Sequence, residues 1–129
     1  TRPPEDASQW GQAEMSAYDV VALYQHILTE MPKQDREFIM SSLRRAPKTA
    51  TGGFDQRFGI DVLRSGAPAA KAGWMCCDTG ELTLHSAGVL GESDRYIVAL
   101  LSRQPTDVGY DEARSMLSEA AEAVDSRLR

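Results

Sequence analysis

The segment AAKAGWMCCDTGELTLHSAGVLGESDRYIVALLS, residues 69–102, decides the fold of this chain of 129 amino acids. It contains three stretches rich in apolar and β-forming residues, at 69–77, at 82–90, and from Tyr96 to Ser102. Two short polar turns, each with a glycine, separate these stretches. Because connections this short join neighbouring antiparallel strands, the segment predicts a three-stranded antiparallel meander.

The third predicted strand is the most apolar of the three. Its core, Ile97-Val98-Ala99-Leu100-Leu101, contains no polar residue. A strand of this kind is typical of a position that is covered on both faces and central to a sheet.

Two helices are predicted before the meander. Ser16 and Asp19 have the spacing of a capping box, and apolar residues follow at helical intervals until Pro32. A second helix is expected at residues 34–45, with three residues on its buried side, namely Phe38, Ile39 and Leu43.

A long C-terminal helix is predicted at residues 111–128 and should pack on the sheet. Its expected apolar face consists of Ala113, Met116, Leu117, Ala120, Ala121, Val124 and Leu128. We expect Asp125 on its solvated face. The order of helix, helix, meander and helix indicates an α+β fold.

The chain has the length of a single domain, residues 1–129, in which residues 1–15 form an N-terminal arm and residues 16–129 the folded part. The segment 46–68 is expected to be a long loop, which four apolar residues hold in place: Phe54, Phe58, Ile60 and Leu63. The sequence opens with Thr1 and not with methionine, so we expect a processed or excised piece of a longer product.

Composition argues against several classes of function. The formal net charge of −5 leaves no basic stripe for nucleic acid, and no apolar run reaches the length of a transmembrane helix. The adjacent Cys76 and Cys77 lack the spacing of a zinc pair, and His26 and His85 are far apart, so no metal or cofactor is expected. Neighbouring strand residues point to opposite faces, which favours two separate thiols and also keeps His85 from pairing with Ser86.

One tripeptide of the first strand carries a resemblance. Lys71-Ala72-Gly73 stands ahead of two further strands and a final helix. This arrangement resembles the K-T-G signature of penicillin-recognising serine hydrolases of the class A β-lactamase-like type, in the form seen in secreted actinobacterial members. The resemblance extends over residues 10–128 and corresponds to the C-terminal part of that fold.

The resemblance implies a substrate-binding role for Lys71, Ala72 and Gly73, with Lys71 facing a substrate carboxylate. No catalytic residue is assigned, because the other two family motifs are missing. No serine lies three residues before any lysine, and the chain contains no asparagine for an S-x-N motif. Ala72 also replaces the usual threonine.

The function expected from the resemblance is therefore the C-terminal portion of a secreted or cell-surface serine hydrolase, inactive by itself. A non-catalytic binding module and an unrelated small domain are the alternatives. The strand from Tyr96 to Ser102 would become a sheet edge in such a portion, and exposed apolar edges pair readily with other chains. The expected partner is either the missing N-terminal portion of the same protein or a second copy.

Overall fold

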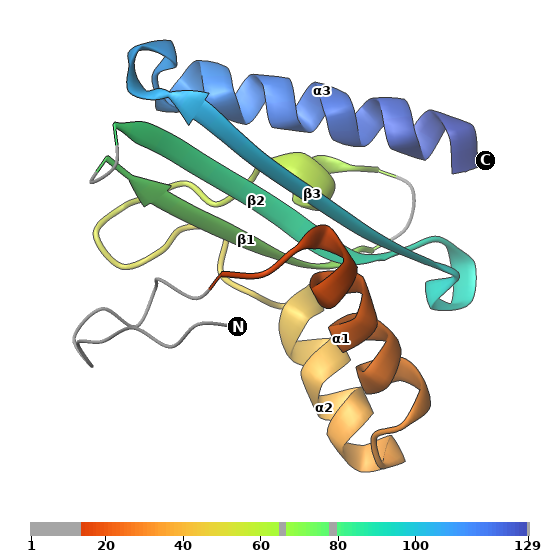
Figure 1. The fold of residues 1–129 in the computed structure, drawn as a ribbon. Helices are drawn as coiled ribbons and strands as arrows, with labels where there is room; N and C mark the ends of the chain where they lie inside the picture. The colour runs from red at the N-terminus through yellow and green to blue at the C-terminus, as the bar shows by residue number, and fades with distance from the viewer. Residues whose placement is uncertain (1–13, 65–66, 78–79, 129) are drawn as a thin grey trace.

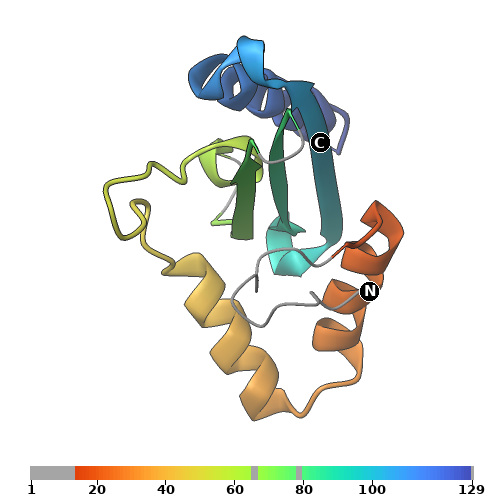
Figure 2. The ribbon, with the colours of Figure 1, turned by 60° about the vertical axis from the view of Figure 1, so that its left-hand side comes forward.

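A computed structural model describes residues 14–64, 67–77 and 80–128 of the chain. An antiparallel sheet lies between a helical hairpin on one face and a single long helix on the other (Figures 1 and 2). The predicted α+β fold is therefore confirmed. The elements are α1 (Ala17–Thr29), α2 (Lys33–Arg44), the 3-10 turn η1 (Gly59–Val62), β1 (Ala69–Cys76), β2 (Glu81–Leu90), β3 (Tyr96–Pro105) and α3 (Tyr110–Leu128).

The three strands form the predicted meander in the order β1-β2-β3. Lys71 lies opposite Ala87 of β2, which in turn lies opposite Ala99 of β3. The central strand is thus β2, and the prediction that the third strand is central was wrong. The apolar run of β3 has another cause: α1 packs against its Ile97 and Ala99, while residues on the alternate face pack on the α3 side.

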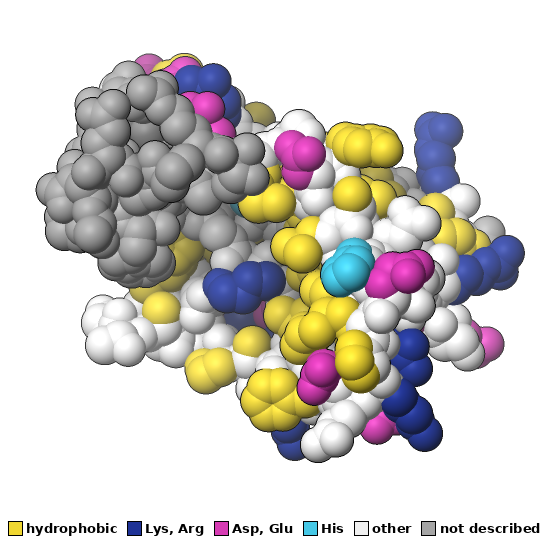
Figure 3. All heavy atoms as spheres, turned by 60° about the horizontal axis from the view of Figure 1, so that its bottom comes forward, with side chains coloured by type: hydrophobic (Ala, Val, Ile, Leu, Met, Phe, Trp, Pro, Cys, Tyr) yellow, Lys and Arg dark blue, Asp and Glu magenta, His cyan; other side chains and the backbone are white. Residues whose placement is uncertain are grey.

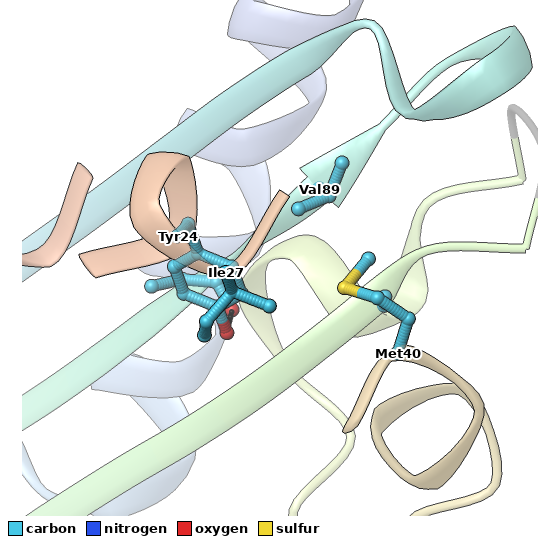
Figure 4. Packing of buried hydrophobic residues seen from close by; sticks show 6 residues of the cluster. Tyr24, Ile27, Met40 and Val89 are labelled. Atoms are coloured by element: carbon cyan, nitrogen blue, oxygen red, sulfur yellow. Dashed lines mark hydrogen bonds between the residues drawn. The ribbon is translucent and has the colours of Figure 1, made fainter. Parts of the chain in front are cut away.

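The layer beneath the sheet is built by α1 and α2. The capping box of Ser16 and Asp19 begins α1 as predicted. Tyr24 and Ile27 of α1 pack with Met40 of α2 and Val89 of β2 (Figure 4). The Tyr24 hydroxyl donates a hydrogen bond of 3.2 Å to the Ala87 carbonyl, so this buried phenol is satisfied.

The buried side of α2 differs from the prediction. Phe38 is 70% exposed, whereas Met40 is only 3% exposed. Ile39 and Leu43 are partly buried, as expected. Since Ile39, Met40 and Leu43 lie on one helical stripe, Phe38 is turned away from the sheet. Figure 3 shows hydrophobic side chains across the middle of the molecular face that lies at the bottom of Figure 1.

The buried stripe of α3 also departs from the prediction. It consists of Ala113, Leu117, Ala121 and Asp125, at intervals of four residues. Met116 is 49% exposed and Ala120 is exposed as well, whereas Asp125, expected in solvent, is 5% exposed. The helix is rotated because it packs on η1 as well as on the sheet, and η1 lies on one flank.

Cys76 and Cys77 are joined by a disulfide, which corrects the expectation of two separate thiols. The rule of alternating faces does not apply to this pair, because β1 ends at Cys76 and Cys77 lies beyond the strand. The peptide bond between the two residues is cis.

Candidate functional site

The segment between α2 and β1 forms the border of the site. It extends beyond the β1 edge of the sheet in Figure 2. Thr49 and Asp55 pair as an isolated bridge, and the Gln56 amide donates a bond of 2.8 Å to the Lys48 carbonyl. Lys48 and Gln56 are thereby fixed side by side.

The following residues anchor this segment in the core. Phe58 and Ile60 have no exposed surface, and Leu63 is 7% exposed, which confirms their predicted role. The Ile60 amide donates a bond of 2.9 Å to the buried Ser86 hydroxyl. Ser86 therefore has a structural role, and His85 points to the opposite face of β2, as predicted.

Lys71 lies at the mouth of a small pocket between β1 and this segment. Its ammonium donates hydrogen bonds to the Ala72 carbonyl and, over 3.5 Å, to Oε1 of Gln56. The pocket has a volume of about 90 Å³. Its lining consists of Ala46, Pro47, Lys48, Gln56, Asp61, Ala70, Lys71 and Ala72.

The two lysines of this pocket differ in their ion pairing. The ammonium of Lys48 is paired with the carboxylate of Asp61. Within the described part of the chain, no carboxylate lies within ion-pair distance of the Lys71 ammonium. The pocket therefore carries one positive charge that these residues do not neutralise.

The three residues of the predicted substrate site do not share one face of β1. The Ala72 side chain is 9% exposed and packs with Phe58 and Leu84, so only its backbone and the strand edge are open to the pocket. Gly73 lies on the same face as Lys71, opposite His85. A Cβ built at Gly73 would be 3.7 Å from the Cβ of His85, an ordinary contact, so the fold does not require glycine here.

An aromatic row on the face of β1 opposite to Lys71 was not predicted as a cluster. The ring of Trp74 stacks on Phe54 with centroids 4.0 Å apart, and Phe54 contacts Tyr110 at 4.5 Å. Trp74 is 47% exposed. The only sequence signal was an aromatic residue within a glycine-rich loop, which does not say which strand the loop will meet.

Tyr110 and Asp55 connect this row to α3. The Tyr110 hydroxyl donates a bond of 2.8 Å to the Asp55 carbonyl, and burial raises the pKa of Tyr110 to about 12. The Asp55 carboxylate accepts hydrogen bonds from Arg57 and lies 3.4 Å from the guanidinium of Arg114. These bonds hold the pKa of Asp55 well below its usual range, so it is a fixed anion.

His85 is half-buried on the face shared with Lys71. Its Nδ1 accepts a hydrogen bond of 3.3 Å from the Ser102 amide. Burial lowers the pKa of His85 below its ordinary value. The imidazole is therefore held neutral, in a structural role, as expected from the sequence.

A second hollow lies between α2 and the connection from β2 to β3. It has a volume of about 530 Å³ and is lined by Leu28, Arg36, Glu37, Met40, Ser41, Arg44, Ser93 and Asp94. Arg44 is paired with Asp94, and Arg36 donates to the Leu28 carbonyl at 3.0 Å. Arg36 thus joins α2 to the end of α1, and Arg44 joins α2 to the turn between β2 and β3.

Neither a metal centre nor a membrane span was found in the described segments. No group of three or more His, Cys, Asp or Glu residues there could hold a metal ion. No helix in these segments has the length and apolar character needed to cross a bilayer.

Sequence comparison relates the chain to two mycobacterial proteins. The proteins named "Putative lipoprotein LppW" in Mycobacterium bovis and in Mycobacterium tuberculosis are each 38% identical to it over 112 residues. The aligned region is 83% of this chain and 35% of each relative, so the chain spans about a third of the length of the curated relatives it matches. No family model matches the chain, and no solved structure matches it.

These comparisons overturn the resemblance to penicillin-recognising serine hydrolases. The similar proteins are named as lipoproteins and not as β-lactamases, and no hydrolase family model matches. The expected identity as the C-terminal portion of such a hydrolase was therefore wrong. A lone K-x-G tripeptide on an edge strand is too short to identify a family, because it recurs by chance.

Proposed function

We propose that this chain is an extracytoplasmic binding domain that takes a small carboxylate at the Lys71 pocket. The single observation that carries the proposal is the exposed ammonium of Lys71, which lacks a carboxylate partner among the described residues. Gln56 and the Ala72 carbonyl hold this ammonium at the pocket mouth. A cation positioned in this way favours an anionic ligand.

Two observations support the extracytoplasmic location. The similar mycobacterial proteins are named as lipoproteins. Cys76 and Cys77 are joined by a disulfide, and disulfides in general persist mainly in oxidising compartments outside the cytoplasm. Both observations support a secreted or cell-surface location for this chain.

The size of the pocket sets the size of the ligand group. A volume of about 90 Å³ accommodates a group as large as about three water molecules. A carboxylate with one adjoining carbon fits this space. For so few atoms we expect a dissociation constant on the order of 1 mM, which corresponds to about −4 kcal/mol. The rest of a larger ligand would lie along the open face of Gly73.

The test is a titration of the ¹⁵N-labelled chain with acetate, followed by NMR. We expect the largest shifts at the amides of Lys71, Ala72 and Gly73. Lys71→Gln should weaken binding about fivefold, because a partly exposed charge contributes ~1 kcal/mol. Added salt should weaken binding by the wild-type chain.

The matched control is Lys33→Gln on α2. This lysine is exposed and paired with Glu37, away from the pocket, so its loss should leave acetate binding unchanged. Equal affinities of Lys71→Gln and the wild-type chain would refute the site. Equal weakening by both substitutions would show that acetate responds only to the overall charge.

A further inference from the structure

From Tyr96 to Leu101 the free edge of β3 lacks the usual protection against pairing with another strand. Among the described residues β3 pairs only with β2. From Tyr96 to Leu101 it contains no charge, no proline and no bulge. All six side chains remain partly or fully exposed, whereas every residue of β2 from Ser86 to Leu90 is buried.

The flank of α3 above this edge carries two exposed apolar residues, Met116 and Ala120. Arg114 and Ser118, on one flank of α3, bond to Asp55 and to the Gly59 amide on the β1 side of the sheet. Met116 and Ala120 lie on the opposite flank, about 160° around the helix from Ser118. They therefore lie on the β3 side, where Met116 is 49% exposed.

We propose that the β3 edge and the Met116–Ala120 flank together form an interface with a second copy of this chain. The two β3 strands pair antiparallel about a two-fold axis perpendicular to the sheet, which makes one continuous sheet. This symmetry places both α3 helices on the same face, with their Met116–Ala120 flanks turned toward each other. An isologous contact of this kind closes at two copies.

The sequence of β3 suits pairing with itself. With Leu100 opposite its own counterpart, Tyr96 of one copy lies opposite Gln104 of the other, and Arg103 lies opposite Ile97. No like charges meet in this register. Shifting the centre to Ala99 would place Arg103 opposite Arg95, which is unfavourable. The only charge within β3, Arg103, is already paired with Glu81 of its own chain.

The occupant is inferred to be a second copy because β3 can pair with itself in a register in which no like charges meet, and because Met116 and Ala120 lie beside the same edge. In this register nine residues of each β3, from Tyr96 to Gln104, pair over about 31 Å. A partner that carries its own α3 also covers Met116 and Ala120, which a single added strand would leave partly exposed.

The experiment is size-exclusion chromatography with light scattering, from micromolar to millimolar concentrations of the chain. The expected mass is about 28 kDa, twice the 14.2 kDa of one chain. Leu101→Lys and Met116→Lys should each give a monomer, since a lysine on an edge blocks strand pairing. Both positions are at least 38% exposed, so the fold should tolerate the change, and circular dichroism checks this.

The matched control is Phe38→Lys, which makes the same kind of change at an exposed apolar residue of α2. It should remain dimeric. A monomeric wild-type chain at millimolar concentration overturns the proposal. If Phe38→Lys alone disrupts the dimer, the interface lies on the helical hairpin. If Met116→Lys alone disrupts it, the two β3 strands do not pair. Either result also overturns it.

Discussion

Gly59 is a position where a single methyl group should be strongly destabilising. Its φ is +62°, and a Cβ added there would overlap the Cβ of Ser86 and lie 2.6 Å from its Oγ. Ser86 belongs to the central strand and is 1% exposed, so it cannot move aside. Any shift also breaks the bond of 2.9 Å from the Ile60 amide to the Ser86 hydroxyl.

The free energy of unfolding should therefore fall by several kcal/mol in Gly59→Ala. The left-handed backbone costs about 1–2 kcal/mol for a residue with a Cβ. An orphaned buried amide or the strain of overpacking adds about 2 kcal/mol more. The sum, about 3–4 kcal/mol, is a large part of the roughly 5–15 kcal/mol available to a domain.

The assay is urea unfolding of Gly59→Ala beside Gly52→Ala. Gly52 has a φ of +91°, but a Cβ there would meet nothing within 4 Å. This control therefore carries the backbone cost alone, about 1–2 kcal/mol. Equal losses in the two variants would show that the contact between Gly59 and Ser86 is not close. Since Gly59 anchors the segment that holds Gln56 beside Lys71, acetate binding should also weaken in Gly59→Ala.

Three further predictions concern burial. Burial lowers the pKa of His85, so the unfolded chain binds a proton more readily than the folded chain, and the free energy of unfolding should fall as the pH drops below about 6.5. In urea unfolding measured over a pH series, the free energy of unfolding should depend less on pH in His85→Gln. The pKa of Tyr110 is raised to about 12, so the unfolded chain loses the phenol proton at a lower pH than the folded chain, and the free energy of unfolding should decline as the pH rises from about 10 to about 12. Tyr110→Phe should remove the last step of the absorbance titration at alkaline pH. Met40→Ala should lower the free energy of unfolding by about 2–4 kcal/mol, because Met40 is buried. Phe38→Ala should lower it by less than about 0.5 kcal/mol, because Phe38 is exposed. Similar losses in the two variants would contradict the orientation of α2.

The elements of the fold could be predicted because their signals are local. The capping box of Ser16 needs only two side chains three residues apart, and the glycine turns fix antiparallel neighbours. The errors concern the place of β3 in the sheet, the bonding of Cys76 to Cys77, and which side of each helix is buried. A run of three consecutive apolar residues in a helix, such as Phe38 to Met40, does not reveal from its sequence which residue faces the sheet.

The candidate site could be predicted only in part. Lys71 was selected on a resemblance that the comparisons overturn. It lies at a pocket because the segment between α2 and β1 places Gln56 beside it. Lys48, Gln56 and Asp61 were missed because they come from a loop whose path depends on how Phe58 and Ile60 dock in the core. No periodic pattern in a loop encodes such a path.

The sequence by itself determined the α+β order, the meander and the start of α1, because these depend on contacts between residues close in the chain. Only the tertiary structure decided that Asp125 is buried and that Lys71 meets Gln56. Those outcomes depend on the rotation of α3 and the docking of the segment before β1. Both are set by packing between residues that are distant in sequence, where the free energy of burial is shared among many side chains.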